Sequence, residues 1–193
     1  MPSPPQPTIS ILPARTPRDL AAVRRLFRAY AASLPIDLSF QGFEKEVEGL
    51  PGRYAEETGE EIEDDERKGE AVGCIALRPL DLQGRELQTS PTTPTTKPTL
   101  HAELKRLYTL PSTRGRGLGR ALLLSILRIA RERGYDVVLL DTLPSMGVAR
   151  ALYEGFGFVE LLPDGAISDG RYYDSPVEGT VFMGLDLSLL QYP

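Results

Sequence analysis

The stretch that decides the fold runs from Leu104 to Leu124 and reads LKRLYTLPSTRGRGLGRALLL. The pattern predicts a strand, a short turn and the start of a helix, in that order. The turn contains three glycines, Gly115, Gly117 and Gly119, which alternate with arginines. Because glycine has no Cβ, these positions let a ligand approach the backbone closely and make positive φ accessible.

The turn is therefore a candidate anion-binding site. The helix after it is largely apolar from Ala121 to Ile129 and keeps Arg128 and Arg131 on its solvent side. The first amides of a helix lack partners within the helix, and the positive end of the helix dipole favours an anion there. Guanidinium groups beside those amides suit a phosphate or pyrophosphate. The alternative is a glycine turn with solvated arginines, but the order of strand, turn and apolar helix favours anion binding.

Two well-known phosphate motifs do not fit this turn. A P-loop ends in Gly-Lys-Ser/Thr, whereas the last glycine here is followed by Arg120 and Ala121. A dinucleotide-binding fingerprint has the spacing Gly-x-Gly-x-x-Gly, whereas the three glycines here are spaced by twos.

The turn instead resembles the acetyl-CoA pyrophosphate loop of the GNAT N-acetyltransferases. That loop has the pattern Arg/Gln-x-x-Gly-x-Gly/Ala, which residues 114–119 match. A second motif follows the strand at residues 137–142, because residues 149–158 are similar to the family's Ala-x-x-Leu-Tyr-x-x-x-Gly-Phe. The two motifs stand at the family's usual distance, and the resemblance covers the chain from Ala71 to Leu187.

The resemblance implies an α/β fold. We expect a single GNAT-like domain with a mixed, mostly antiparallel sheet, a central parallel pair splayed to hold acetyl-CoA, and helices on both faces. The domain is expected over residues 8–193, after a flexible start at residues 1–7. Two inserted loops are expected within it, an acidic one at residues 52–69 and a Pro/Thr-rich one at residues 88–99.

Local patterns predict the elements of this domain. Thr16 and Pro17 are typical of a helix start, as N-cap and first helical residue. A second helix is expected at about residues 40–50, and strands are expected at residues 8–12, 70–80, 101–109, 137–142, 158–162 and 180–187, the last two as an antiparallel pair. The run Glu56–Glu66 is rich in carboxylates that repel one another, so it is expected to be a solvated loop. A rim that attracts cations is the alternative. The family's second strand would then be short or missing.

Composition sets further bounds. A chain of 193 residues suits one domain with a sizeable core. A net charge of −5 argues against a general nucleic-acid surface and mildly favours a cationic or neutral substrate. The single cysteine, Cys74, lies in an apolar run and is expected to be a buried thiol. We expect no membrane segment, no metal, and a cytoplasmic location with the nucleus as an alternative; a monomer and a homodimer both stay open.

By position in the family motifs, the resemblance implies a set of cofactor contacts. The main chains of Leu107 and Thr109 would hydrogen-bond the pantetheine arm. The pyrophosphate would be surrounded by Arg114, Gly115, Arg116, Gly117, Leu118, Gly119 and Arg120. Thr142, Ala149 and Tyr153 would line the far side of the cleft. Met146 stands where many members place an asparagine, and Ser145 is the possible substitute for that polar contact.

The family reaction needs no covalent enzyme intermediate, since an amine attacks the thioester directly. A backbone amide near Leu107 would polarise the thioester carbonyl. Tyr153 stands where the family places its general acid, with packing as the alternative role. Glu103 is the first candidate for the base, and a surface or salt-bridged carboxylate is an equal alternative. Asp141 and His101 are further candidates for that base.

Substrate contacts are expected from two regions. In the family, the first helix pair and its connection overhang the acceptor site, which makes Asp37, Phe40 and Phe43 candidates. Cap and core roles are equally compatible with these three residues. Tyr172 and Tyr173 lie in the loop before the last strand and are candidates for an acceptor wall.

The resemblance thus implies an N-acetyltransferase that moves an acetyl group from acetyl-CoA to a small amine or amino group within a ternary complex. One alternative is an acyl-CoA-binding or regulatory module without turnover. Another is a protein-lysine or N-terminal acetyltransferase.

Overall fold

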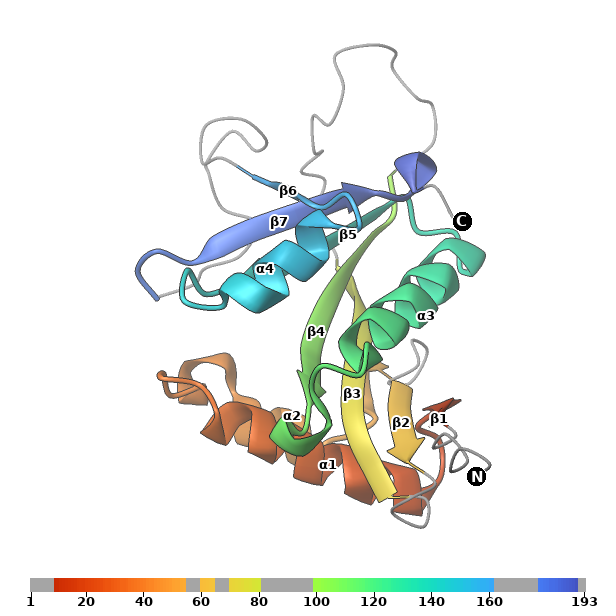
Figure 1. The fold of residues 1–193 in the computed structure, drawn as a ribbon, viewed down its shortest axis with the longest axis vertical. Helices are drawn as coiled ribbons and strands as arrows, with labels where there is room; N and C mark the ends of the chain where they lie inside the picture. The colour runs from red at the N-terminus through yellow and green to blue at the C-terminus, as the bar shows by residue number, and fades with distance from the viewer. Residues whose placement is uncertain (1–8, 55–59, 65–69, 81–98, 162–176, 191–193) are drawn as a thin grey trace, which may run out of the picture. The chain divides into compact units, whose positions relative to one another are not determined.

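The computed structural model describes residues 9–54, 60–64, 70–80, 99–161 and 177–190, which Figure 1 draws as a coloured ribbon. Their strands form a mixed sheet with the order β1-β2-β3-β4-β5-β7-β6. The chain divides into two units, one of residues 1–78 and 105–126 and the other of residues 79–104 and 127–193. The predicted α/β class and mixed sheet are confirmed.

The first unit contains most of the helices. Its strands are β1 (Ile9–Pro13), β2 (Glu60–Asp64), most of β3 (Glu70–Leu80) and the later part of β4 (His101–Thr109). Its helices are α1 (Pro17–Ala32), α2 (Phe43–Glu48), the start of α3 (Leu118–Glu132) and the short 3-10 helices η1 (Ser39–Gln41), η2 (Gly52–Tyr54) and η4 (Pro111–Thr113). The predicted ranges of β3 and β4 are confirmed to the residue.

Helix α1 begins where the sequence predicts. Thr16 Oγ1 accepts the Asp19 amide at 3.2 Å, and the Asp19 carboxylate accepts the Thr16 amide at 2.7 Å, so the two residues cap the helix reciprocally. The predicted helix at residues 40–50 is shorter than expected. Gly42, at φ 68°, separates η1 from α2, because a left-handed residue interrupts the helical path.

The expectation of a loop over the acidic run is wrong for residues 60–64, which form β2. This strand pairs antiparallel with both β1 and β3, so its backbone is hydrogen-bonded on two sides. Pairing of the strand backbone on both sides therefore outweighs the repulsion that the acidic run led us to expect. Across the strands, the acidic residues oppose neutral ones except where Asp64 faces Glu70.

In the first unit, helices cover both faces of the sheet. Helices α1 and α2 contribute Phe27 and Val47 to a core that also contains Cys74 and Tyr108 from the strands. On the other face, a Cβ at Gly73 would lie 3.5 Å from Leu122 of α3. The expectation that Cys74 is a buried thiol is confirmed, since the residue is fully buried.

The second unit contains the parallel pair. The first residues of β4 pair in parallel with β5 (Val137–Thr142), which in turn pairs antiparallel with β7 (Val181–Asp186). The predicted final antiparallel pair is confirmed as β6 (Val159–Glu160) and β7. Helix α4 (Gly147–Glu154) starts after Met146, which makes no side-chain cap.

Strand β4 is irregular at Arg106. This residue has φ 59°, which side chains other than glycine adopt only at a cost of about 1–3 kcal/mol. A left-handed residue inside a strand turns the following residues relative to the preceding ones. The parallel pairing of β4 with β5 is recorded for residues 101–103, before this point.

A buried ion pair holds the Arg106 side chain. Its Nε and Nη2 atoms donate to the two carboxylate oxygens of Glu46 at 3.0 and 2.8 Å, and Nη2 also donates to Gln41 at 3.1 Å. The guanidinium lies 5.2 Å from the ring centre of Phe43 and 5.8 Å from that of Tyr30. The Arg106 and Glu46 side chains are 3% and 14% exposed. Helix α2, η1 and the irregular point of β4 are therefore tied together.

The electrostatics of this pair favour its charged form. Burial alone would raise the pKa of the Glu46 carboxyl, but the hydrogen bonds and charge of Arg106, together with the hydrogen bond from Tyr54, hold that pKa below its usual 4.5. Burial and the charge of Glu46 raise the pKa of the Tyr54 hydroxyl, which therefore stays protonated. It donates to Glu46 at 2.9 Å.

We predict that Glu46→Gln lowers the free energy of unfolding by about 3–5 kcal/mol, because Arg106 would remain buried without its counter-charge. Urea denaturation at pH 7 measures this. The matched control is Glu44→Gln on the same helix, whose carboxylate forms an exposed pair with Arg28 at 3.3 Å. Removing that pair should cost about 0–1 kcal/mol. Equal losses in the two variants would contradict the role of the buried pair.

The same pair predicts a pH dependence. Since the pKa of Glu46 is depressed in the folded state, its contribution to stability is complete above the unfolded-state pKa, near 4.5, and is lost as the pH falls through the folded-state pKa. The difference in the free energy of unfolding between wild type and Glu46→Gln should therefore become smaller as the pH falls below about 4.5. A difference that stays constant down to acid unfolding would show that Glu46 does not act through its charge.

Candidate functional site

The Gly/Arg turn, residues 114–117, joins η4 to helix α3. Gly115 and Gly117 have φ 79° and 78°, the left-handed values for which the sequence supplies glycine. A Cβ at either position would have no neighbour within 4 Å, so the outer side of the turn is open. The first intrahelical bond runs from Ala121 to the Gly117 carbonyl. The amides of residues 118–120 therefore precede the helical ladder.

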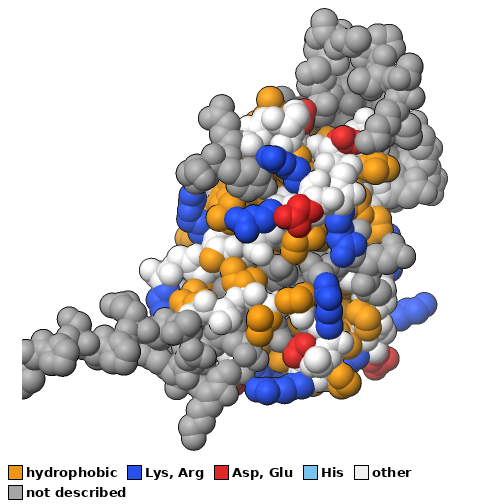
Figure 2. Space-filling model, turned by 90° about the vertical axis from the view of Figure 1, so that its right-hand side faces the viewer, with side chains coloured by type: hydrophobic (Ala, Val, Ile, Leu, Met, Phe, Trp, Pro, Cys, Tyr) orange, Lys and Arg blue, Asp and Glu red, His pale blue; other side chains and the backbone are white. Residues whose placement is uncertain are grey.

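These features fit a phosphate or pyrophosphate. The glycines leave the backbone accessible, Arg114 and Arg116 are exposed beside it, and the N-terminus of a helix follows. Leu118 is 4% exposed and anchors the first turn of α3 in the core. Figure 2 shows basic side chains in separate groups among apolar and uncharged atoms on the face that it draws. Charge alone therefore does not mark the site, and the backbone geometry of the turn does.

Strands β3 and β4 approach each other closely next to this turn. The Leu110 amide donates to the Val72 carbonyl at 2.8 Å. A Cβ at Gly73 would lie 3.0 Å from the Tyr108 carbonyl oxygen and 3.1 Å from a methyl group of Thr109, so only glycine fits there without a shift. Leu107 and Thr109, whose main chains the resemblance assigns to the pantetheine arm, are both half-buried. That assignment stays a prediction.

Three further predicted cofactor contacts lie in the second unit. Thr142 is 6% exposed, and its hydroxyl donates to Met146 Sδ at 3.6 Å, so Met146 takes a polar partner where the family has an asparagine. Ala149 is half-buried on α4. Tyr153 is 6% exposed and packs on Phe158 at a ring-centre distance of 5.7 Å. The packing role is therefore present, and the role of Tyr153 as general acid stays a prediction.

The candidate bases differ in their surroundings. Glu103 is completely buried, which excludes the alternative of a surface carboxylate. His101 is 7% exposed, and burial lowers its pKa despite a backbone hydrogen bond to Thr99 and the nearby charge of Asp136. A neutral, buried imidazole favours the structural role for His101. Asp141 is half-buried on β5.

The predicted acceptor contacts divide into three groups. The Asp37 carboxylate accepts the amide of Ser39, the first residue of η1, at 2.7 Å. Phe43 is 6% exposed and belongs to the core beneath Arg106, whereas Phe40 is 41% exposed. Tyr172 and Tyr173 lie outside the described residues, as does most of the Pro/Thr-rich insert at residues 88–99.

Sequence reasoning missed the Arg106–Glu46 pair. The two residues are 60 positions apart, and neither belongs to a family motif. The signal that could have found them is the charged pair Lys105-Arg106 inside a strand that is otherwise expected to be buried. Lys105 and Arg106 are 7% and 5% exposed.

Two features are absent from the part of the chain that the structure describes. No group of three or more His, Cys, Asp or Glu side chains in that part of the chain could hold a metal ion. None of its helices has the length and apolar character needed to cross a membrane.

Comparisons with known proteins identify the family of this chain. The sequence model of the acetyltransferase (GNAT) family matches residues 25–158. An uncharacterised N-acetyltransferase of Schizosaccharomyces pombe is 30% identical over 180 residues, which are 93% of this chain and 96% of the relative.

Solved structures show the same fold. An acetyltransferase of Streptococcus agalactiae superimposes with a TM-score of 0.66 at 20% identity, over 92% of this chain and 98% of that one. The GNAT N-acetyltransferase YhbS of Escherichia coli, solved in complex with CoA, gives 0.60 at 21% identity, over 96% and 84%. Since the family model covers well over half of the sequence and the yeast relative matches along nearly its full length, the chain belongs to the GNAT acetyltransferase family.

Proposed function

We propose that this protein is an N-acetyltransferase with acetyl-CoA as donor and an amino group as acceptor. The observation that carries the proposal is the open turn at Gly115 and Gly117, which leads into the N-terminus of α3. Membership of the GNAT family and the CoA complex of YhbS, a protein of the same fold, support it.

The chain's own groups supply binding and orientation. The amides of residues 118–120 and the arginines of the turn bind the pyrophosphate. The main-chain groups of Leu107 and Thr109 form hydrogen bonds with the pantetheine arm, which pairs with β4 as an additional strand would. Acetyl-CoA, when bound, supplies the thioester whose acetyl group passes to the amine. The Leu107 amide, next to the left-handed Arg106, stabilises the developing negative charge on the carbonyl oxygen.

Two proton movements complete the proposal. The Tyr153 Oη donates a proton to the departing sulfur, which is the role that the family motif gives this tyrosine. Glu103 accepts the proton from an ammonium acceptor, directly or through water. Because Glu103 is completely buried, the proposal includes a chain of water molecules that connects its carboxylate with the acceptor.

Two other functions belong to the same family. An acyl-CoA-binding module without turnover would keep the turn and lose the acid and base. A protein-lysine or N-terminal acetyltransferase would keep the chemistry and take a peptide acceptor. Thioester cleavage measured across a panel of free amines and peptides separates the three.

We predict that Gly117→Val abolishes CoA binding in isothermal titration calorimetry at low salt. A side chain at this position would project into the open space beside the turn, and a β-branched residue at φ 78° is strained. A loss of at least about 100-fold in affinity is expected, because the variant should block every amide contact of the turn at once.

The matched control is Gly134→Val, after the end of α3. Gly134 has φ 82° and also has no neighbour within 4 Å of an added Cβ, so it carries the same backbone penalty without lying in the turn. This variant should lose stability and keep CoA affinity. If Gly117→Val bound CoA as tightly as Gly134→Val, the cofactor assignment would fail.

For Tyr153→Phe we predict a fall in kcat of about 100-fold with CoA affinity unchanged, because general acid catalysis typically contributes that much. Phenylalanine preserves the packing on Phe158, so the fold should not be affected. Tyr135→Phe, which removes a hydroxyl elsewhere in the same unit, serves as control. An unchanged kcat in Tyr153→Phe would remove the acid role and leave this tyrosine with packing alone.

A further inference from the structure

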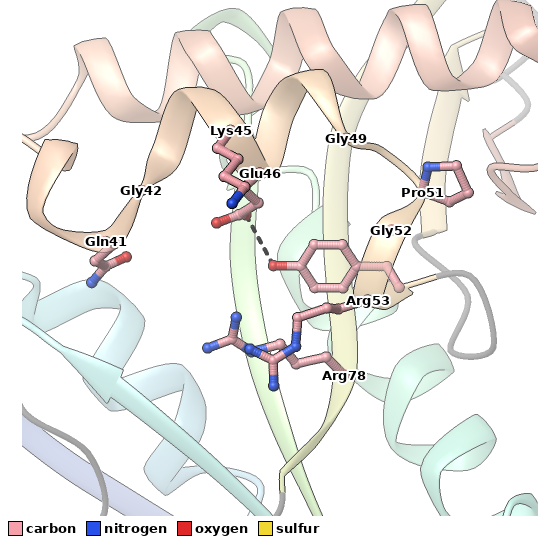
Figure 3. Close-up of a pocket in the computed structure, with 10 residues that line it drawn as sticks. Gln41, Gly42, Lys45, Glu46, Gly49, Pro51, Gly52, Arg53 and Arg78 are labelled. Atoms are coloured by element: carbon pink, nitrogen blue, oxygen red, sulfur yellow. Dashed lines mark hydrogen bonds between the residues drawn. The ribbon is translucent and has the colours of Figure 1, made fainter.

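The first unit contains a pocket of about 300 Å³ between α2, η2 and the end of β3 (Figure 3). Among the residues that line it are Gln41, Lys45, Glu46, Arg53, Tyr54 and Arg78. The sequence motifs do not include any of these residues.

The charges of this pocket are mostly positive. Lys45, Arg53 and Arg78 line it, and the only carboxylate among its lining residues belongs to Glu46. That carboxylate is already neutralised by Arg106 at 2.8 Å. Among the described residues, neither Lys45 nor Arg53 takes part in a salt bridge. An anion entering the pocket would therefore meet an excess of positive charge.

Two of the cationic side chains, Arg53 and Arg78, line the same pocket. Figure 3 shows the side chains of Arg53 and Arg78 extending to the same side of the pocket. The Tyr54 hydroxyl is already committed as a donor to Glu46. Two planar guanidinium groups that reach the same space match the oxygens of a carboxylate or phosphate.

The pocket lies at the opposite end of β3 from the Gly/Arg turn. Val72 pairs with Leu110 beside the turn, and Cys74 Sγ donates to the Arg106 carbonyl, so β3 and β4 run antiparallel. Arg78 is six residues beyond Val72, or about 20 Å along the strand. The irregular point of β4 lies between the two ends.

One cluster connects the pocket with the proposed reacting centre. Gln41 and Glu46 line the pocket and also accept hydrogen bonds from Arg106. Arg106 directly precedes Leu107, whose amide is proposed to stabilise the developing charge. A ligand in the pocket is therefore adjacent to the residues that hold the reacting centre.

We propose that this pocket binds an anionic group of the acceptor, so that the preferred substrate is an amine that also carries a carboxylate or phosphate. The inference rests on the proposed acetyl transfer. Net charge favoured a cationic or neutral substrate, but it is a property of the whole chain. Salt screens distant charges beyond about 8–10 Å, so the basic pocket dominates at contact.

The first experiment compares matched acceptors. Initial rates are measured for 4-aminobutanoate against 4-aminobutanamide, and for O-phosphoethanolamine against ethanolamine. The acidic member of at least one pair should have a kcat/KM about 10- to 100-fold higher, mainly through KM, since hydrogen bonds to charged groups contribute that range. The pair with the larger ratio of acidic to neutral kcat/KM shows whether the pocket prefers a carboxylate or a phosphate. Equal kcat/KM within both pairs would overturn the proposal.

Variants connect the preference with the pocket. Arg53→Gln combined with Arg78→Gln should reduce the ratio of acidic to neutral kcat/KM to about one, while calorimetry should give unchanged CoA affinity. Arg53→Glu should shift the preference toward 1,4-diaminobutane, because it exchanges the sign of one lining charge. Arg15→Gln is the control, since Arg15 is exposed at the start of α1 and does not line the pocket. A ratio that survives the double substitution would place the selectivity elsewhere.

A binding experiment separates this inference from the proposed function. Inorganic phosphate is titrated into the full chain carrying Gly117→Val, in which the turn is blocked, and then into the same chain with Arg53→Gln and Arg78→Gln added. Weaker phosphate binding in the second protein supports an anion pocket even if no acetyl transfer is found, in which case only the proposed function fails. Equal binding in both proteins contradicts the pocket, whatever the enzyme assays show.

Discussion

The first unit depends on the buried ion pair between Arg106, at the irregular point of β4, and Glu46 of α2. Arg106 has a left-handed backbone conformation and a buried guanidinium, each of which costs free energy by itself. Glu46 and Gln41 supply three hydrogen bonds, and two aromatic rings lie within 6 Å of the charge. Because these partners come from α1, α2 and the connection between them, the strand can keep its irregular geometry only when the helices are in place.

The first unit contains two regions that we propose bind anions, and the two are of different kinds. The Gly/Arg turn offers main-chain amides at a helix start, where glycine geometry excludes side chains. The pocket beside α2 offers guanidinium and ammonium groups from three elements. Amides bind a phosphate by close approach, whereas flexible cationic side chains can adapt to different acids. The first kind suits an invariant cofactor and the second suits an acceptor that sets specificity.

Much of the candidate site follows from local sequence. Some features depend only on neighbouring residues, so the sequence pattern predicts them directly. They are the glycines at positive φ, the helix start with Thr16 and Asp19, and apolar strands such as Val137–Thr142. The loop predicted over the acidic run failed at Glu60–Asp64 because pairing with β1 and β3 on both sides outweighs the repulsion of the carboxylates. The Asp37 carboxylate accepts the Ser39 amide and Phe43 is buried, and a substrate role for either residue stays a prediction.

The sequence alone thus determined the family, the order of most elements and the turn that is proposed to hold pyrophosphate, since all of these are encoded over short distances. Only the tertiary structure decided where the charges of Glu46, Arg53, Arg78 and Arg106 lie relative to one another. These residues come from four separate elements, up to 60 positions apart. Hydrogen bonds and ion pairs act over a few ångströms in space, and no periodicity along the chain records which distant side chains folding brings within that range.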